Sequence, residues 1–203
     1  MDLNIIRDIN KLWLPVYPGI ARQIAEHCFS QPEQILEVGC FSGGIGLSLL
    51  KEFPQSTLTI ALETEELVST FSTDWQESID KKCAERCRIV STPLAPLTIA
   101  NQFFDLVICR GVFFFLDTNG TILSEMYRLL SPGGLVFAGG GFGSYTHPDI
   151  IKQLADESRR LNYALGRKVF SRQEFDRVLS NAGLAGHAQV IKDGGLWAVI
   201  RKP

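Results

Sequence analysis

The sequence has no excess of charge of either sign, no signal sequence and no long hydrophobic run. Its 203 residues include 20 Lys and Arg against 22 Asp and Glu, so no broad cationic face is available for a long nucleic acid. Acidic residues interrupt the apolar N-terminus, and no later apolar run is long enough to cross a bilayer. We therefore expect a cytoplasmic protein with neither nucleic acid nor membrane as partner, and the oligomeric state stays open.

Cysteine is also sparse and irregularly spaced. The five cysteines are odd in number, which fits reduced thiols better than a disulfide framework. Cys83 and Cys87 have a C-x-x-x-C spacing, but no second Cys/His pair follows them at ligand spacing. We therefore predict no bound metal.

What the sequence does contain is an alternation of short apolar runs with helical segments. The last two runs flank a short Gly-rich connection at 192–195, which is typical of an antiparallel hairpin. The predicted strands lie at residues 35–38, 58–62, 88–91, 104–109, 135–138, 187–191 and 196–200. This pattern predicts an α/β fold: a Rossmann-like seven-stranded sheet, parallel except for an antiparallel last strand, with helices on both faces.

The length favours one domain with three parts. A chain of 203 residues is long enough for one core and short of two full domains. We expect a helical N-terminal cover over 1–30, a ligand-binding core over 34–143, and C-terminal helices with a hairpin over 144–203.

A Gly-rich turn follows the first predicted strand. Residues 34–44 read Gln-Ile-Leu-Glu-Val-Gly-Cys-Phe-Ser-Gly-Gly, in which glycines let the backbone approach a ligand and direct helix N-terminal amides at it. Glu37 lies inside the apolar run, so we expect a cationic or hydrogen-bond-donating partner for it, such as a ligand ammonium. Glu63 ends the second strand, where a carboxylate accepts the ribose hydroxyls of an adenosine-containing cofactor.

At these residues the chain resembles the class I methyltransferases that use S-adenosylmethionine. Glu37, Gly39 and Gly43 match the family's acid-x-Gly-x-Gly-x-Gly motif, and Glu63 matches its ribose-binding acid. The segments 104–108 (Phe-Asp-Leu-Val-Ile) and 125–134 (Glu-Met-Tyr-Arg-Leu-Leu-Ser-Pro-Gly-Gly) match its fourth strand and the helix and turn before its fifth. The chain departs from the family pattern where Phe41 replaces the middle glycine and where the third strand lacks the acid placed beside the adenine.

The resemblance implies an enzyme that transfers a methyl group from S-adenosyl-L-methionine to a small molecule by in-line displacement. This reaction needs alignment of the two reactants and exclusion of water more than it needs a base, and the sequence leaves the catalytic residues unknown. The positions implied for the cofactor are Tyr17, Glu37, Gly39, Cys40, Phe41, Ser42, Gly43, Glu63, Thr64, Thr92, Leu94 and Arg110. For Arg110 two partners stay open, the carboxylate of the cofactor or an anionic substrate. Phe114, Tyr145 and His147 are candidates for substrate binding, because they follow strands at the ligand edge of an open α/β sheet.

Two alternatives stay open. A nicotinamide-dependent oxidoreductase also uses a strand, a glycine turn and a later acid, but Phe41 breaks its G-x-G-x-x-G pattern. A noncatalytic protein that binds S-adenosylmethionine or S-adenosylhomocysteine would keep the fold without the activity.

Overall fold

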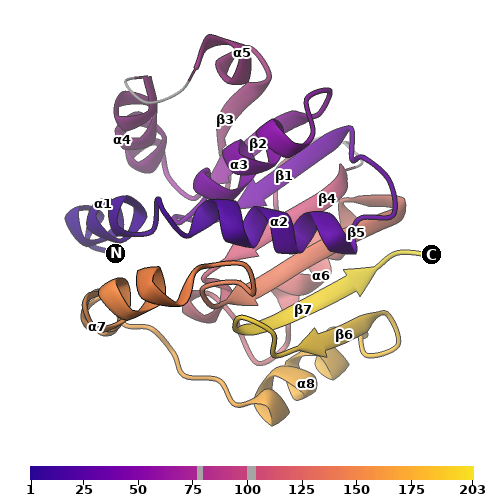
Figure 1. The fold of residues 1–203 in the computed structure, drawn as a ribbon. Coiled ribbons are helices and arrows are strands. Elements are labelled where there is room, and N and C mark those ends of the chain that lie inside the picture. Colours follow the sequence, from indigo (N-terminus) through magenta and orange to yellow (C-terminus); the bar gives the residue numbers. More distant parts are fainter. Residues whose placement is uncertain (77–79, 100–103) are drawn as a thin grey trace.

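The computed structural model describes residues 1–76, 80–99 and 104–203, and their strands form one sheet. The strand order is β3-β2-β1-β4-β5-β7-β6 (Figure 1). The strands are β1 (Gln34–Val38), β2 (Thr57–Leu62), β3 (Cys87–Ser91), β4 (Phe104–Arg110), β5 (Leu130–Gly140), β6 (Ala188–Ile191) and β7 (Leu196–Arg201). Strands β1 to β5 pair in parallel, whereas β7 is antiparallel to both β5 and β6. The predicted fold, with its antiparallel last strand, is confirmed.

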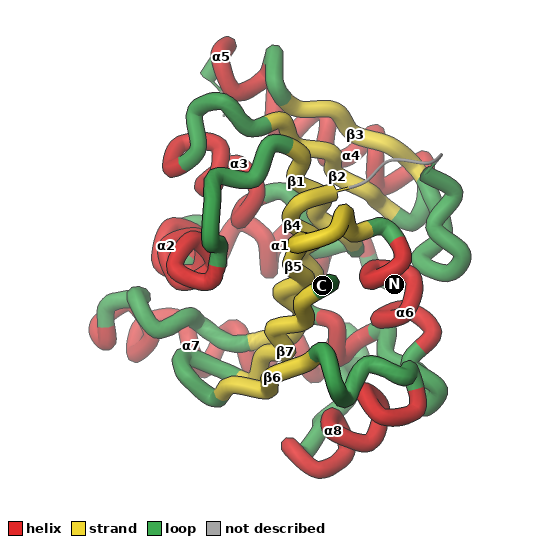
Figure 2. The backbone as a smooth tube through the Cα atoms, turned by 90° about the vertical axis from the view of Figure 1, so that its right-hand side faces the viewer, coloured by secondary structure: helices red, strands yellow, loops and turns green. Residues whose placement is uncertain are grey.

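Helices cover both faces of this sheet, as Figure 2 shows with the sheet seen nearly edge-on. One hydrophobic cluster joins the sheet to α2, α3 and α7, and a second joins the other face to α6 and α8. The helices are α1 (Leu3–Leu12), α2 (Tyr17–His27), α3 (Gly44–Glu52), α4 (Glu65–Gln76), α5 (Lys81–Ala84), α6 (Thr121–Arg128), α7 (Pro148–Ala164) and α8 (Arg172–Asn181), with a 3-10 turn, η1, at Val112–Phe114. No helix that the described residues form is long and apolar enough to span a bilayer.

The parallel strands bring distant loops to one edge. In the sheet register Glu37 stands opposite Ile60 of β2 and Ile108 of β4, and Arg110 stands opposite Gly139 of β5. The turns that follow β1, β2, β4 and β5 therefore meet at the carboxyl edge of the sheet, where open α/β folds bind their ligands.

Strand β5 begins five residues earlier than predicted. Leu130 already pairs with Phe104, the register then shifts, and regular pairing resumes between Leu135 and Leu106. The Pro-Gly-Gly segment at 132–134, which the sequence predicts as a turn before the strand, is an irregularity within it. Its backbone is held by the chain end, since Gly133 N donates to Lys202 O at 2.9 Å.

Asp105 ties together the starts of three strands at the opposite edge. Its Oδ2 accepts hydrogen bonds from the backbone N of Glu33 (2.8 Å) and Gln34 (3.0 Å) before and in β1. Its Oδ1 accepts a third from Ser131 Oγ of β5 at 2.8 Å. This carboxylate is therefore structural and lies away from the ligand edge.

We expect Asp105→Ala to lower the free energy of unfolding by about 1–3 kcal/mol, because two backbone N–H groups and one hydroxyl lose a charged acceptor. Urea unfolding followed by circular dichroism measures this. The matched control is Asp156→Ala, whose side chain is 95% exposed and which should change stability by less than about 0.5 kcal/mol. Equal effects of the two substitutions would contradict the structural role of Asp105.

Candidate functional site

Glu37 of β1 is a fully buried carboxylate at the ligand edge. Its Oε2 accepts a hydrogen bond from Gly46 N in the first turn of α3 at 2.8 Å, whereas its Oε1 has no partner among the described residues. Burial raises the pKa of this carboxyl group to about 7, against the opposing effect of the α3 amides and of Arg110. The expected hydrogen-bond donor is thus present for one oxygen, and the other remains available to a ligand.

The glycine turn between β1 and α3 is closely packed. Gly39 and Gly43 have φ values of +100° and +112°, a backbone conformation that favours glycine. A Cβ on Gly44 would lie 2.1 Å from the ring of Tyr17, so this ring lies directly on the turn. Ser42 is buried in the turn and its Oγ has no partner among the described residues. Helix α3 begins after Gly43, which has no side chain to cap it, and in its first turn Gly46 N donates to Glu37 as described above.

Glu63 follows β2 at the same edge. Its Oε1 is buried without a partner among the described residues, and burial raises the pKa of this carboxyl group. The neighbouring Thr64 is exposed, and its Oγ1 accepts a hydrogen bond from Leu67 N at 3.2 Å in the first turn of α4. Glu63 is therefore free to accept hydrogen bonds from a ligand, whereas Thr64 already caps a helix.

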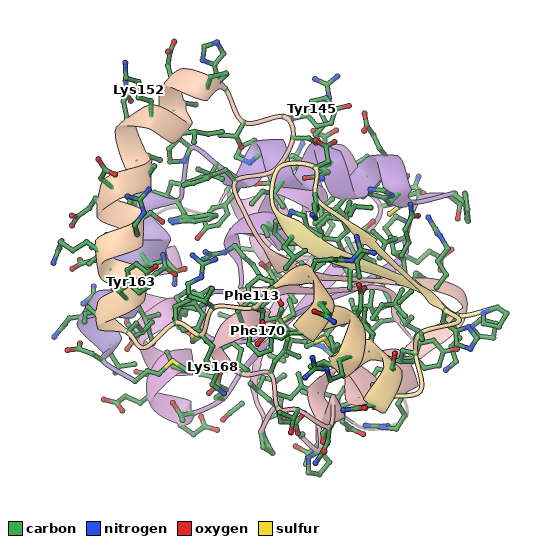
Figure 3. All side chains as sticks on the ribbon, turned by 90° about the horizontal axis from the view of Figure 1, so that it is seen from below. Phe113, Tyr145, Lys152, Tyr163, Lys168 and Phe170 are labelled. Atoms are coloured by element: carbon green, nitrogen blue, oxygen red, sulfur yellow. The ribbon has the colours of Figure 1, made fainter. Side chains whose placement is uncertain are left out.

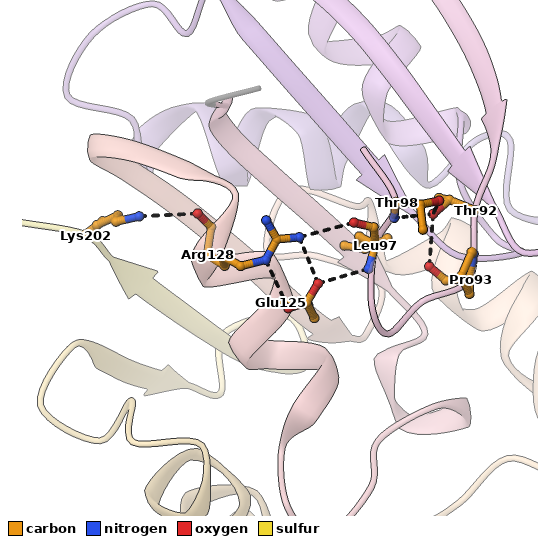
Figure 4. A network of polar contacts seen from close by, with 7 residues as sticks. All are labelled: Thr92, Pro93, Leu97, Thr98, Glu125, Arg128 and Lys202. Atoms are coloured by element: carbon orange, nitrogen blue, oxygen red, sulfur yellow. Dashed lines mark hydrogen bonds and ion pairs between the residues drawn. The ribbon is translucent and has the colours of Figure 1, made fainter. Parts of the chain in front are cut away.

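Thr92 and Leu94 lie in the segment after β3, which a polar network holds against α6 (Figure 4). Thr92 Oγ1 accepts from Thr98 N at 2.8 Å and also contacts Thr98 Oγ1 at 2.9 Å, so its hydroxyl is used internally. Glu125 Oε2 of α6 accepts from Leu97 N at 2.9 Å and pairs with Arg128 at the same distance. Leu94 is half-buried against the second hydrophobic cluster. This segment presents apolar and backbone groups to the ligand edge.

Arg110, the last residue of β4, is 4% exposed and makes no ion pair with a carboxylate of the described residues. Its Nη2 donates to Asn10 Oδ1 (2.9 Å), Tyr17 OH (3.1 Å) and Phe41 O (3.3 Å). Its Cζ lies 4.6 Å from the ring centroid of Trp13, 5.2 Å from that of Tyr17 and 4.9 Å from that of Phe41. Aromatic faces and neutral oxygens thus take the place of a counter-charge. Its Nε is buried and has no partner there.

Helix α1 covers the glycine turn through Asn10, a residue that no sequence pattern predicts. Asn10 Nδ2 donates to Cys40 O at 3.3 Å, while its Oδ1 accepts from both Arg110 and Tyr17. Burial raises the pKa of Tyr17 to about 12, which keeps its hydroxyl protonated as a donor to Asn10. Cys40 and Phe41 are themselves buried. No motif marks Asn10, because its role depends on how α1 packs on a turn 30 residues away.

A cavity of about 380 Å³ adjoins this cluster on the side of β4, β5 and β7. Its walls combine Arg110 and Phe114 from the end of β4 with Gly140 and Phe142 from the end of β5. The remaining lining comes from Trp13, Gly111, Phe113, Gly141, Ala155, Ser158, Arg159, Asn162, Arg167, Val169, Phe170, Gly195 and Leu196. Phe114 therefore lies where the sequence predicts a substrate-contacting residue.

Tyr145 and His147, the other two predicted substrate residues, do not line the cavity. Tyr145 is 40% exposed, its hydroxyl donates to Glu26 Oε1, and Arg22 lies 4.3 Å above its ring. Figure 3 shows it apart from Phe113 and Phe170 at the cavity wall. His147 is the N-cap of α7 and its Nδ1 accepts from Asp149 N at 3.3 Å. Both side chains are thus occupied by local contacts, and neither is carried into the functional proposal.

The described residues contain five buried side-chain polar atoms without a hydrogen-bond partner, and four of them lie at this edge. They are Glu37 Oε1, Ser42 Oγ, Glu63 Oε1 and Arg110 Nε, with Trp197 Nε1 as the fifth. An unsatisfied buried polar atom costs about 1–3 kcal/mol, so such a concentration needs an explanation. These four atoms belong to two carboxyl groups, a hydroxyl and a guanidinium. They suit a ligand that carries hydrogen-bond donors and acceptors together with a positive and a negative group.

Comparison with known proteins finds methyltransferases among both sequences and solved structures. A family model described as a methyltransferase domain matches residues 36–138. A malonyl-[acyl-carrier protein] O-methyltransferase of Priestia megaterium is 26% identical over 169 residues, which make up 80% of this chain and 58% of that protein. The chain spans only 58% to 64% of the length of the three curated relatives that it matches.

Solved structures share the fold over nearly the whole chain. A protein of Methanococcus maripaludis, described as an S-adenosyl-L-methionine-dependent methyltransferase, superposes with a TM-score of 0.80 at 23% identity and covers 99% of this chain and 93% of its own. Human N-acetylserotonin methyltransferase, solved in complex with S-adenosylmethionine, has a TM-score of 0.67 at 18% identity and covers 98% of this chain and 55% of its own.

The raised pKa of Glu37 predicts a pH-dependent stability that Glu37→Gln removes. A carboxyl group whose pKa is about 7 when folded and about 4.5 when unfolded binds its proton more tightly in the folded state. Its contribution to the free energy of unfolding is therefore greatest at low pH and declines as the pH rises toward 7. Between pH 5 and 8 the stability of the ligand-free protein should fall by about 2–3 kcal/mol relative to Glu37→Gln.

Urea titrations of both proteins at half-unit pH intervals measure this difference. Glu66→Gln, at an exposed position of α4, is the control and should follow the original protein at every pH. A constant difference between Glu37→Gln and the original protein across this range would show that Glu37 is not protonated preferentially in the fold.

Proposed function

The chain belongs to the methyltransferase domain family, and from this we propose that it transfers a methyl group from S-adenosyl-L-methionine to a small-molecule acceptor by in-line displacement. Membership of the family confirms the resemblance of the glycine turn, the strand-end acid and the 125–134 segment, and makes the protein an enzyme of the methyltransferase class. It also sets aside the nicotinamide-dependent alternative.

The observation that supports the methyl donor is the set of unsatisfied polar atoms around the glycine turn. Glu37 Oε1 has the charge to accept from the donor's ammonium, and Glu63 Oε1 to accept from its ribose hydroxyls. The Ser42 hydroxyl, at the start of α3, suits its carboxylate. The donor would thereby satisfy three buried atoms that this chain leaves without partners.

We assign the donor to the positions implied by the family motif. They are Tyr17, Glu37, Gly39, Cys40, Phe41, Ser42, Gly43, Glu63, Thr64, Thr92 and Leu94. Arg110, the twelfth position that the motif implies, also lines the 380 Å³ cavity, so its place in the structure leaves both the donor and an anionic acceptor open as its partner. Thr64 and Thr92 would contribute through backbone or methyl groups, because their hydroxyls are used within the chain. Tyr17, with α1 above it, would cover the donor.

The mechanism requires the chain to align two ligands and to exclude water. The bound donor supplies a methyl group on a sulfonium, and the cavity beside Arg110 and Phe114 provides the place for the acceptor. Correct alignment alone lowers the barrier by about 7–11 kcal/mol in favourable cases. The acyl-carrier-protein substrate named for the curated relatives is not assigned to this chain, because it spans less than two thirds of their length.

We expect the chain to bind S-adenosylhomocysteine and not NADH. We also expect Glu63→Ala to raise the dissociation constant of S-adenosylhomocysteine about 10- to 100-fold, since a charge-assisted hydrogen bond contributes about 1.5–3 kcal/mol. Isothermal titration calorimetry measures all three values. Glu66→Ala, three residues further on in exposed α4, should stay within about twofold of the original protein.

Two results would contradict this proposal. One is binding of NADH without binding of S-adenosylhomocysteine. The other is an equal loss of affinity in Glu63→Ala and Glu66→Ala, which would remove Glu63 from the donor site.

A further inference from the structure

The cavity beside Arg110 has an unusual balance of charge. Three arginines line it, and the lining that the described residues form contains no Asp or Glu. Arg159 of α7 is paired with Asp156 outside the lining at 3.0 Å, whereas Arg110 and Arg167 have no such ion pair with a described residue. The same lining contains no His, Lys, Cys or Tyr, so it offers no side chain that takes up a proton near neutral pH.

We propose that the methyl acceptor is an organic acid, that its carboxylate is the group methylated, and that Arg110 holds this carboxylate. The inference rests on the proposed function, since it assumes that the cavity is the acceptor side of a methyltransferase. It assigns Arg110 to the acceptor, which decides between the two partners that its position in the sequence leaves open.

Arg110 has both the charge and the unsatisfied donor that this role requires. It is 4% exposed, its Nε has no partner, and no carboxylate of the described residues pairs with it. Burying a guanidinium without a counter-ion is costly, and a ligand carboxylate is the anion that its planar donors fit best. The donor's own carboxylate has Ser42 and the start of α3. The cavity wall is therefore where the unneutralised charge of Arg110 meets a ligand.

The absence of a base from the described lining points to the same acceptor. A phenol or an ammonium must lose a proton before or during methylation, whereas a carboxylate is already ionised at neutral pH. In the proposed step one carboxylate oxygen forms a bond to the methyl carbon while the carbon–sulfur bond breaks and its electron pair stays on sulfur. A carboxylate anion and a sulfonium cation become a neutral methyl ester and a neutral thioether, and no proton is transferred.

The remaining walls describe the skeleton of the acid. Trp13 and Phe142 stack with ring centroids 4.9 Å apart, and Phe113 and Phe170 stack at 5.7 Å. Gly140 also lines the cavity, and a Cβ on it would lie 3.2 Å from the ring of Phe113. A volume of about 380 Å³ with these walls fits an acid of small to medium size with a flat or branched apolar skeleton.

The first test is a methyl-transfer assay with radiolabelled S-adenosylmethionine. The acceptors are benzoate, phenylacetate, cinnamate and octanoate, each paired with the primary amide and the primary alcohol of the same skeleton. We expect label on at least one acid and on none of its partners, in a product that releases labelled methanol with mild base, as an ester does. A base-stable product, or transfer to none of the acids by protein that binds S-adenosylhomocysteine, would overturn the inference. Protein that fails to bind S-adenosylhomocysteine would instead overturn the proposed function.

The second test assigns Arg110. Arg110→Met should raise the KM for the acid at least tenfold, and by a larger factor than it raises the dissociation constant of S-adenosylhomocysteine. The second value can rise as well, because Arg110 Nη2 also donates to Phe41 O of the glycine turn. Arg110→Lys should have an intermediate KM because it keeps the charge and loses the fork of donors. Arg160→Met, on α7 and paired with Glu157, is the control and should change neither value.

Circular dichroism and urea unfolding show whether each variant is folded. If Arg110→Met does not fold, the KM for the acid is compared between Arg110→Lys and the original protein instead. The same KM is measured for Arg167→Met, which removes a second cation of the lining whose side chain has no partner among the described residues. Weakened binding of S-adenosylhomocysteine with an unchanged KM for the acid would place Arg110 in the donor site and overturn the assignment.

Discussion

The ligand edge of this protein is organised around one buried cation, Arg110. A guanidinium with no paired carboxylate among the described residues is expensive to keep away from water, so its surroundings must supply oxygen acceptors and aromatic faces. Asn10 and Trp13 come from α1 and its C-terminal end, Tyr17 begins α2, and Phe41 belongs to the glycine turn. Two stretches that are distant from β4 in sequence, residues 10–17 and the glycine turn, are thereby held around the end of this strand.

The same cluster explains why the family's middle glycine is replaced. Phe41 lies against the guanidinium of Arg110 and, at 4.9 Å between ring centroids, against Phe114. Its ring also restricts the residue after β4, because a Cβ on Gly111 would lie 2.6 Å from it, and Gly111 has a φ of +74° that favours glycine in any case. Gly111, 70 positions later in the sequence, thus leaves the space that the bulky ring of Phe41 occupies. The residue that departs from the family motif is therefore packed between the glycine turn, Arg110 and Phe114.

Much of the fold and of the donor side follows from the sequence, because both are encoded locally. The alternation of apolar runs and helices predicts the sheet, and strand ends place Glu37 and Glu63 at one edge without knowledge of any side-chain contact. The environment of Arg110 could not be predicted in this way, since Asn10 lies 100 residues earlier and reaches it only through the packing of α1. Tyr145 follows β5 as expected but is held by Glu26 of α2, a contact that no local pattern signals.

The two parts of the proposed site differ in the same way: a short motif specifies the residues proposed for the donor, whereas packing brings together the residues proposed for the acceptor. The donor side consists largely of backbone at strand ends and of acids that stand at the ends of β1 and β2, so a short motif is enough to specify it. The cavity that we propose for the acceptor instead combines β4 and β5 with α1, α7 and the segment between α7 and α8, parts that carry no shared motif. Arg110 lies at the boundary between the two parts, because its Nη2 donates to the glycine turn through Phe41 O while its side chain lines the cavity.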